Sequence, residues 1–322
     1  MRLAYSLGSL MSVNQILDCA SHLSKYNPDT IWIPETWGME NFSMLGMVSQ
    51  KNSSAKIGSS IINIYSRTPS LVAMGAATVD TISDGRLILG LGTSSFPIVE
   101  NFHGLKFEKP ISRMREYIDI IRLVLTGKQV NYEGNFFKLK NFSLLIKPVR
   151  VSIPIYLAAV NQKMVELTWE IADGVIFYLR PITELKKTIA SMQEKKKIDV
   201  SCQIITCVSE DSQKAIERAK KTLAFYISVG DIYRNFLATN GFYNETNNIV
   251  QEFKKSGLEN VHEFVTDGMI KSLTISGTPQ ECLSQLKKFR ETGLDLPIIQ
   301  FNPIDDVKKS FSLLTSTFSG EI

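Results

Sequence analysis

The sequence predicts an α/β protein folded as a (β/α)8 TIM barrel with insertions in its βα loops. Three observations support this fold class. Short apolar runs recur along the chain, each followed by a segment whose apolar residues have helical spacing. Eight such units are spread evenly over 322 residues. No Pro-, Gly- or Ser-rich linker separates them, so we expect one domain over residues 1–322. Alternating strands and helices give a parallel sheet covered by helices. Eight units favour a closed barrel over the alternative, an open doubly wound sheet.

The elements can be assigned in order along the chain. The expected strands are residues 3–7, 30–34, 55–62, 86–92, 153–159, 173–178, 200–208 and 297–301. Ser12 can cap the helix after the first strand, and Thr68 and Thr278 each precede a proline that suits the first position of a helix. Further helices are expected to begin near residues 40, 111, 162, 183 and 211.

Three stretches are longer than the connections of a barrel require: residues 94–110, 127–148 and 232–271. The second carries a hairpin-like turn signal at residues 132–136, and the third is largely polar with scattered aromatic residues. We expect the first and third to act as lids over the binding site, because long loops of barrel enzymes commonly cover the substrate.

Composition excludes several classes of function. Thirty-six basic and 32 acidic residues give a net charge of +4, which is too small for a nucleic-acid-binding footprint. The longest uncharged run, residues 3–17, is shorter than the ~20 residues that span a bilayer. The four cysteines and three histidines lack metal-ligand spacing, so reduced thiols and no metal site are expected. The sequence therefore predicts a cytoplasmic protein that acts on a small molecule, without nucleic acid or membrane.

The predicted strands end in small and polar residues, and barrel enzymes carry their chemistry at these ends. The residues at the ends of strands two to five are Glu35, Thr36, Ser60, Ile61, Asn63, Gly92, Thr93, Ser94, Ala158, Ala159, Val160 and Asn161. Two other motifs are weak or absent. Gly90-Leu91-Gly92 begins a dinucleotide fingerprint but has Ser95 in place of the third glycine, and the chain has no GxSxG hydrolase elbow.

Several short motifs, taken together, resemble the bacterial-luciferase-like superfamily. They are residues 31–38 (IWIPETWG), 66–69 (SRTP), 84–92 (DGRLILGLG), 156–159 (YLAA) and 172–174 (ADG), and their order matches over about residues 1–305. Residues 92–94, 102–104 and 108–110 are most similar to the F420-dependent branch, which includes methylenetetrahydromethanopterin reductase. The resemblance implies a TIM barrel that binds the deazaflavin F420 or, alternatively, FMN, in a homodimer or higher homo-oligomer.

The resemblance also implies roles for the candidate residues. A non-proline cis peptide against the coenzyme ring would correspond to Ser60–Ile61. Asn63 and residues 92–94 would approach the coenzyme closely, and residues 158–161 would open a helix whose positive end suits its phosphate. Glu35 corresponds to an acid beside the coenzyme, and we expect Trp32 and Trp37 to bury it and suit it to proton transfer. Thr36 stands where many relatives carry histidine, so it would only hydrogen-bond the ring. Glu35 and Thr36 are the catalytic candidates.

Three functions are compatible with these features. The first is hydride transfer between F420 and a small organic substrate, with reduction of a methylenetetrahydropterin as one candidate reaction. The second is an FMN-dependent monooxygenase. The third is a non-catalytic flavin-binding relative, which would agree with Thr36 and Ser95 at positions where relatives have more reactive side chains. The end of the first strand, residues 5–9, also lacks the acid expected of the reductase. The coenzyme class is therefore better predicted than the substrate or the direction of reaction.

Overall fold

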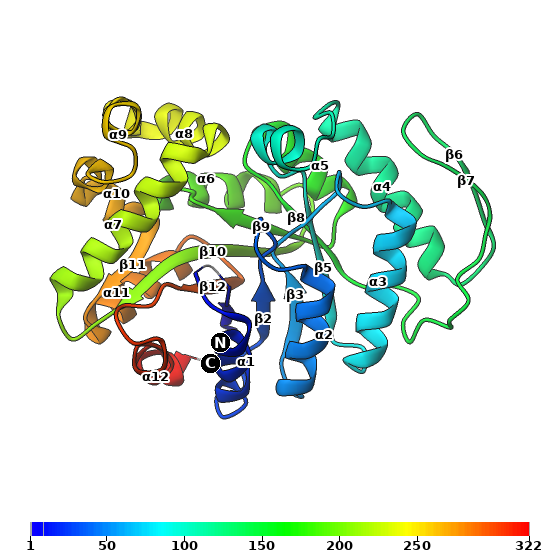
Figure 1. The fold of residues 1–322 in the computed structure, drawn as a ribbon, viewed down its shortest axis with the longest axis horizontal. Helices are drawn as coiled ribbons and strands as arrows, with labels where there is room; N and C mark the ends of the chain where they lie inside the picture. Colours follow the sequence, from blue (N-terminus) through cyan, green and yellow to red (C-terminus); the bar gives the residue numbers. More distant parts are fainter. Residues whose placement is uncertain (1, 9, 322) are drawn as a thin grey trace.

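A closed ring of eight parallel strands forms the centre of the computed structural model, which describes residues 2–8 and 10–321. The ring strands, in chain order, are β1 (Ala4–Ser6), β2 (Thr30–Ile33), β3 (Lys56–Ser59), β5 (Leu87–Gly92), β8 (Ile155–Ala158), β9 (Gly174–Tyr178), β10 (Asp199–Val208) and β12 (Leu296–Phe301). Pairing of β9 with β10 and of β12 with β1 closes the ring (Figure 1). The predicted (β/α)8 barrel is confirmed.

A helix follows each ring strand and lies on the outside of the barrel. These helices are α1 (Val13–Leu23), α2 (Asn41–Lys51), α3 (Pro69–Ile82), α4 (Pro110–Leu125), α5 (Gln162–Ile171), α6 (Ile182–Gln193), α7 (Ser212–Val229) and α12 (Val307–Phe318). Three predicted caps are present: the hydroxyls of Ser12, Thr68 and Thr278 each accept a backbone N–H of the first turn of α1, α3 and α11 (Pro279–Arg290). These helix starts were readable because a cap is a local hydrogen bond.

Two strands differ from the prediction. The expected third strand is divided, because β3 ends at Ser59 and the short β4 (Ile62–Asn63) pairs separately with β5. Between them, the Ser60–Ile61 peptide bond is cis, as the resemblance implied. A further strand of the same sheet, β11 (Thr274–Gly277), was missed. It pairs with the second half of β10, along the edge where β9 pairs with the first half.

All three long insertions are folded. Residues 94–110 contain a π-helical turn, Pro97–Phe102. Residues 232–271 lie almost entirely in α8 (Asp231–Leu237), a π-helical turn (Ala238–Phe242), α9 (Tyr243–Ser256), a 3-10 turn (Val261–Phe264) and α10 (Asp267–Leu273), which cluster beside α7 in Figure 1. Residues 127–148 form the expected hairpin, β6 (Val130–Glu133) and β7 (Lys138–Phe142). This hairpin follows α4 and precedes β8, so it lies in an αβ connection and not, as predicted, in a βα loop.

Large side chains fill the interior of the barrel. Trp32 and Tyr156 occupy its interior, and glycine at positions 58 and 174 makes room for them, since an added Cβ would lie 2.4 Å from the Trp32 ring and 2.7 Å from the Tyr156 ring. Near the N-terminal ends of the strands, the guanidinium of Arg2 pairs with the carboxylates of Asp29 (2.9 Å) and Asp199 (2.8 Å). The space for a ligand is therefore at the opposite end, where the strands terminate.

Candidate functional site

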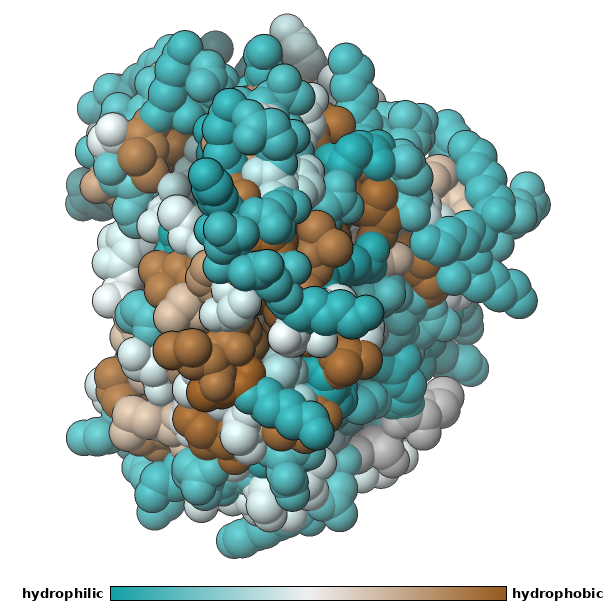
Figure 2. Space-filling model, turned by 90° about the vertical axis from the view of Figure 1, so that its right-hand side faces the viewer, coloured by the Kyte–Doolittle hydropathy of each residue, from teal (hydrophilic) through white to brown (hydrophobic). Residues whose placement is uncertain are grey.

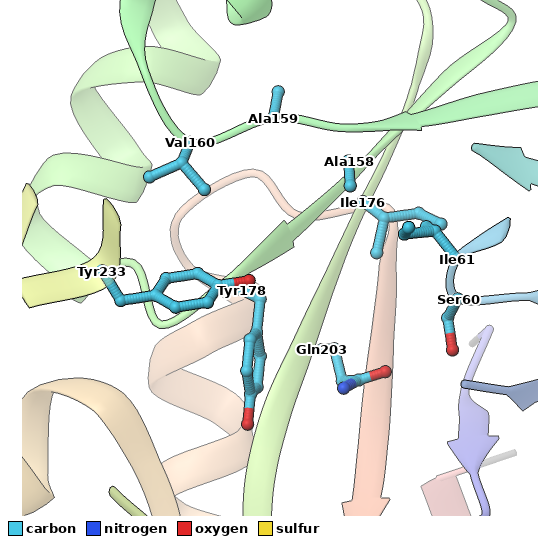
Figure 3. A pocket seen from close by; sticks show the side chains of 9 residues that line it. All are labelled: Ser60, Ile61, Ala158, Ala159, Val160, Ile176, Tyr178, Gln203 and Tyr233. Carbon is cyan, nitrogen blue, oxygen red and sulfur yellow. The ribbon is translucent and has the colours of Figure 1, made fainter. Parts of the chain in front are cut away.

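Two adjacent regions of the barrel mouth are hollowed. The inner pocket is lined by Ser60, Ile61, Ala158, Ala159, Val160, Ile176, Tyr178, Gln203 and Tyr233 (Figure 3). The outer pocket is lined by Glu35, Thr36, Trp37, Gly38, Met39, Glu40, Asn63, Ser66, Arg67, Ser94, Ile98 and His103. Five predicted site residues therefore line the inner pocket and four line the outer one. Three predicted residues, Gly92, Thr93 and Asn161, line neither.

Gly92 nevertheless shapes the wall of the inner pocket. A Cβ added at Gly92 would lie 2.7 Å from side-chain carbons of Ile61 and 3.3 Å from the Cβ of Ala158. The absence of a side chain on β5 is what allows Ile61 to pack between these strand ends. Directly after Gly92, the chain turns at Ser94, whose φ of +58° lies in the left-handed region. Of residues 92–94, only Ser94 lines a pocket, and the close approach of this turn to a ligand stays a prediction.

Glu35 is held by an arginine. The guanidinium of Arg67 donates two hydrogen bonds to its carboxylate, at 2.8 and 2.7 Å, and the N–H of Asn41 donates a third at 3.1 Å. Both side chains are largely buried, 13% exposed for Glu35 and 15% for Arg67. The hydrogen bonds from Arg67 to Glu35 raise the pKa of the guanidinium. Both oxygens of the Glu35 carboxylate are hydrogen-bonded to a guanidinium that stays charged. The pair is therefore better suited to holding these strand ends in position than to transferring protons.

The expected surroundings of Glu35 are therefore corrected. Trp32 points into the barrel, where its ring centroid lies 5.8 Å from that of Tyr156. Trp37 is 58% exposed and packs edge-on against Phe102 of the 94–110 insertion. Trp32 is on β2, where alternation directs its side chain into the barrel. Trp37 follows the strand and lines the outer pocket together with Glu35, but it remains largely exposed and does not bury the carboxylate.

The inner pocket carries polar side chains without charge. Gln203 on β10 lines it and is 8% exposed, and Gln300, on the adjacent strand β12, is 3% exposed and lies outside the lining. Within the described residues, their Oε1 atoms and the Oγ of Ser60 have no hydrogen-bond partner. In Figure 3 the Gln203 amide and the Ser60 hydroxyl lie on the same side of the pocket. Buried polar groups gain stability when a ligand pairs with them, so these atoms suit a heterocycle that presents N–H and C=O groups.

Aromatic rings form the opposite wall of the inner pocket. The Tyr178 ring meets those of Tyr226 and Tyr233 edge to face, with centroids 5.1 and 5.5 Å apart. Burial raises the pKa of Tyr178 well above its ordinary value, and the neighbouring Tyr226 adds to the shift. The phenol is therefore neutral at physiological pH and can take part in hydrogen bonds only in its protonated form. The pocket is apolar on its faces and polar at one edge, and this arrangement fits a flat deazaflavin or flavin ring.

The start of α5 is the predicted phosphate site. The backbone N–H groups of Met164 and Val165 both donate to the Asn161 carbonyl at 3.0 Å. Helix geometry leaves the N–H groups of Gln162 and Lys163 without intrahelical acceptors. Residues 161–163 are exposed beside the pocket-lining Val160. This turn has donors available for an anion, and its phosphate-binding role stays a prediction.

Sequence reasoning missed several residues of the site. Arg67 belonged to a motif but had no assigned role, while Tyr178, Arg180, Gln203 and Tyr233 were not singled out. Tyr178 ends a predicted strand, so the strand-end rule would have found it. Gln203 lies inside a predicted strand, where only the closed barrel determines that it faces the pocket. Of the three histidines, His103 lines the outer pocket, brought there by the 94–110 insertion.

Comparison with known proteins identifies the family. The model of the luciferase-like monooxygenase family matches residues 2–296. A 5,10-methylenetetrahydromethanopterin reductase from Archaeoglobus fulgidus is 31% identical over 301 residues, which cover 89% of each chain. The chain belongs to the luciferase-like family, and the resemblance stated from the motifs is confirmed.

Two solved structures share the fold. The F420-dependent tetrahydromethanopterin reductase from Methanopyrus kandleri superposes with a TM-score of 0.87 at 22% identity, covering 97% of this chain and 96% of that one. An F420-dependent secondary alcohol dehydrogenase bound to an F420-acetone adduct gives a TM-score of 0.79 at 17% identity, covering 100% and 98%. In the part of the chain that the structure describes, no helix is long and apolar enough to cross a bilayer. The same residues contain no group of three or more His, Cys, Asp or Glu side chains that could hold a metal.

Proposed function

We propose that this protein is an F420-dependent oxidoreductase, which transfers a hydride between the deazaflavin and a small organic substrate. The observation that carries the proposal is the inner pocket. The buried Oγ of Ser60 and Oε1 of Gln203, which have no hydrogen-bond partner in the described part of the chain, belong to a pocket that Ile61 and Ala158 also line. The chain around this pocket is 31% identical to a 5,10-methylenetetrahydromethanopterin reductase over 89% of its length.

The side chains supply binding and orientation. When bound, the deazaflavin would supply the hydride chemistry. Ser60 and Gln203 would hydrogen-bond the polar edge of its ring, and Ile61 and Ala158 would form an apolar wall. The tyrosines would exclude water, which protects a hydride transfer from competing reactions. The N–H groups at the start of α5 would bind the phosphate. This scheme needs no covalent nucleophile from the protein.

We further propose that the substrate carries a methylene group on nitrogen, as in 5,10-methylenetetrahydromethanopterin. The similarity to the reductase from Archaeoglobus fulgidus supports this choice. Hydride transfer to such a group needs no base at the reacting carbon, which suits an inner pocket lined by no carboxylate or histidine. We place the enzyme in the cytoplasm, where its four buried thiols would stay reduced.

Coenzyme titration tests this function. We expect the protein to bind F420 tightly, with FMN at least about tenfold weaker, and to oxidise reduced F420 with 5,10-methylenetetrahydromethanopterin but not with acetone. Gly92→Val should abolish coenzyme binding, because its side chain would occupy the space of Ile61. Gly46→Ala, on α2 and outside both pockets, is the matched control, since its Cβ would meet nothing within 4 Å. Binding of FMN alone would instead favour the monooxygenase.

The protein also presents an apolar surface on two neighbouring helices. Met47 on α2 and Leu71, Met74 and Ile82 on α3 are exposed, and α2 and α3 pack side by side. Figure 2, viewed from the side of α3 and α4, shows apolar side chains gathered in a patch. Such patches on soluble proteins commonly mark interfaces. We propose that a second copy of the chain covers this face.

A charge placed in this face should separate the subunits. Met74→Lys is expected to raise the dimer dissociation constant at least about tenfold, because burying an unpaired ammonium is costly. Light scattering after size exclusion measures the mass. Leu258→Lys, at an equally exposed site in the 232–271 insertion, should leave the mass unchanged. A monomeric wild type, or an unaffected Met74→Lys, would contradict the proposed interface.

A further inference from the structure

Arg180 is a charged residue buried beside the inner pocket. It follows β9, two residues beyond Tyr178, and is only 3% exposed. Its Nη2 donates a hydrogen bond of 2.6 Å to the carbonyl oxygen of Val160. Its Nη1 donates to the carboxylate of Glu184 and, at 3.1 Å, to the hydroxyl of Thr188. The guanidinium is thus held on one edge by α6 and on the other by the chain between β8 and α5.

The flat faces of the same guanidinium contact two aromatic rings. Its carbon lies 4.4 Å from the centroid of Phe177 on β9 and 4.6 Å from that of Phe236 on α8. Phe236 stands three residues after Tyr233, so the two share one side of α8. Tyr233 on α8 and Val160, between β8 and α5, both line the inner pocket, and they lie next to one another in Figure 3. One side chain therefore ties together two walls of the pocket.

The contacts indicate that Arg180 acts by holding neighbouring segments in place, and not through the electric field of its charge. The carboxylate of Glu184 pairs with the guanidinium and offsets its charge locally. Arg180 itself is not among the residues that line the pocket, whereas its partner Val160 is. The effect left to Arg180 is that its contacts fix the distance between Val160 and α8. Without the clamp, α8 would keep its contacts with α7 and α9 and the contact of Tyr233 with Tyr178 on β9, but would lose the contact between Phe236 and the guanidinium.

We propose that Arg180 is a positioning residue, which holds the Val160 segment and the α8 insertion at the spacing required for coenzyme binding. The identity of the coenzyme rests on the proposed function; the clamp itself rests on the contacts of Arg180. Lysine cannot replace it, because an ammonium lacks the planar fork that bonds Val160 and Glu184 together while stacking between two rings.

The test compares Arg180→Lys and Arg180→Met with the wild-type full-length protein. We expect both variants to raise the coenzyme Kd and KM at least about tenfold while kcat stays within about twofold. Limited proteolysis should cut the 232–271 insertion several times faster in both. Arg115→Met is the matched control, because Arg115 makes a bidentate pair with Glu170 on the exposed surface and should change none of these values.

Each outcome decides the proposal. Wild-type affinity and wild-type proteolysis in Arg180→Lys would overturn it, as would a lower melting temperature with unchanged coenzyme Kd. If Arg180→Met does not fold, Phe236→Leu is the second variant. It removes one of the two rings beside the guanidinium and should also raise the coenzyme Kd, by a smaller factor. Wild-type titration separates the two hypotheses: a protein that binds FMN and not F420 fails the proposed function, and the Arg180 comparison is then made with FMN. Proteolysis of the insertion tests the clamp without any coenzyme.

Discussion

Gly90→Ala is expected to destabilise the folded protein by about 3 kcal/mol or more, the upper range for overpacking a tightly packed site. A Cβ at Gly90 would lie 1.8 Å from the carbonyl oxygen of Ser59 and 3.0 Å from its carbonyl carbon. These are backbone atoms, so no side-chain rotation relieves the clash. Two hydrogen bonds of 2.8 Å between the Ser59 hydroxyl and the Gly90 backbone hold the strands at this distance. Relief requires β3 and β5 to separate.

Urea unfolding of Gly90→Ala against Gly38→Ala measures this effect. Gly38 also lies at the mouth, but a Cβ there would meet nothing within 4 Å. The control should therefore change the free energy of unfolding by less than about 1 kcal/mol, in the stabilising direction if alanine restricts the unfolded chain. A loss under about 1 kcal/mol in Gly90→Ala would mean that the two strands separate easily, and the contact would not define the position of Ser60 and Ile61.

The parts of the fold that sequence predicted are those encoded locally. Ser12, Thr68 and Thr278 cap their helices through neighbours three residues away. The ring strands are apolar runs, because parallel strands are buried on both faces. By contrast, β11 reads Thr-Ile-Ser-Gly, with one large apolar residue. It is a strand because the second half of the ten-residue β10 leaves an edge to pair with, and pairing between distant segments leaves no periodic pattern.

The candidate site was predictable to the same extent. The rule that strand ends carry function placed Ser60, Ile61 and Ala158 at the inner pocket. The rule says nothing about which side chains then meet. Glu35 and Arg67 are 32 residues apart, and the Arg180 clamp joins residues from three separate segments. Such contacts depend on the closure of the barrel and on folded insertions, so they follow only from the three-dimensional arrangement.

Arg67→Met is expected to lower the free energy of unfolding by about 2–3 kcal/mol, a loss second to that of Gly90→Ala. It leaves the largely buried carboxylate of Glu35 without its cation, and removal of one partner from a buried pair is costly. The neighbouring Glu40 carboxylate, 2.6 Å from Nη2 of Arg67, loses its partner as well. Glu35→Gln should cost less, about 1 kcal/mol, because an amide retains one hydrogen bond and Arg67 keeps Glu40.

Kinetics of the two variants and of the double variant Glu35→Gln/Arg67→Met separate the roles of Glu35. If the pair fixes the outer pocket, both single variants should lose turnover by similar factors, and the double variant should lose little more, because all three remove the same interaction. The pH dependence of kcat should keep its shape. If Glu35 carries a proton, Glu35→Gln alone should lose far more turnover than Arg67→Met and should remove a titration from the profile. The bidentate geometry favours the first outcome, since a proton on Glu35 would weaken its charge-assisted pair with Arg67.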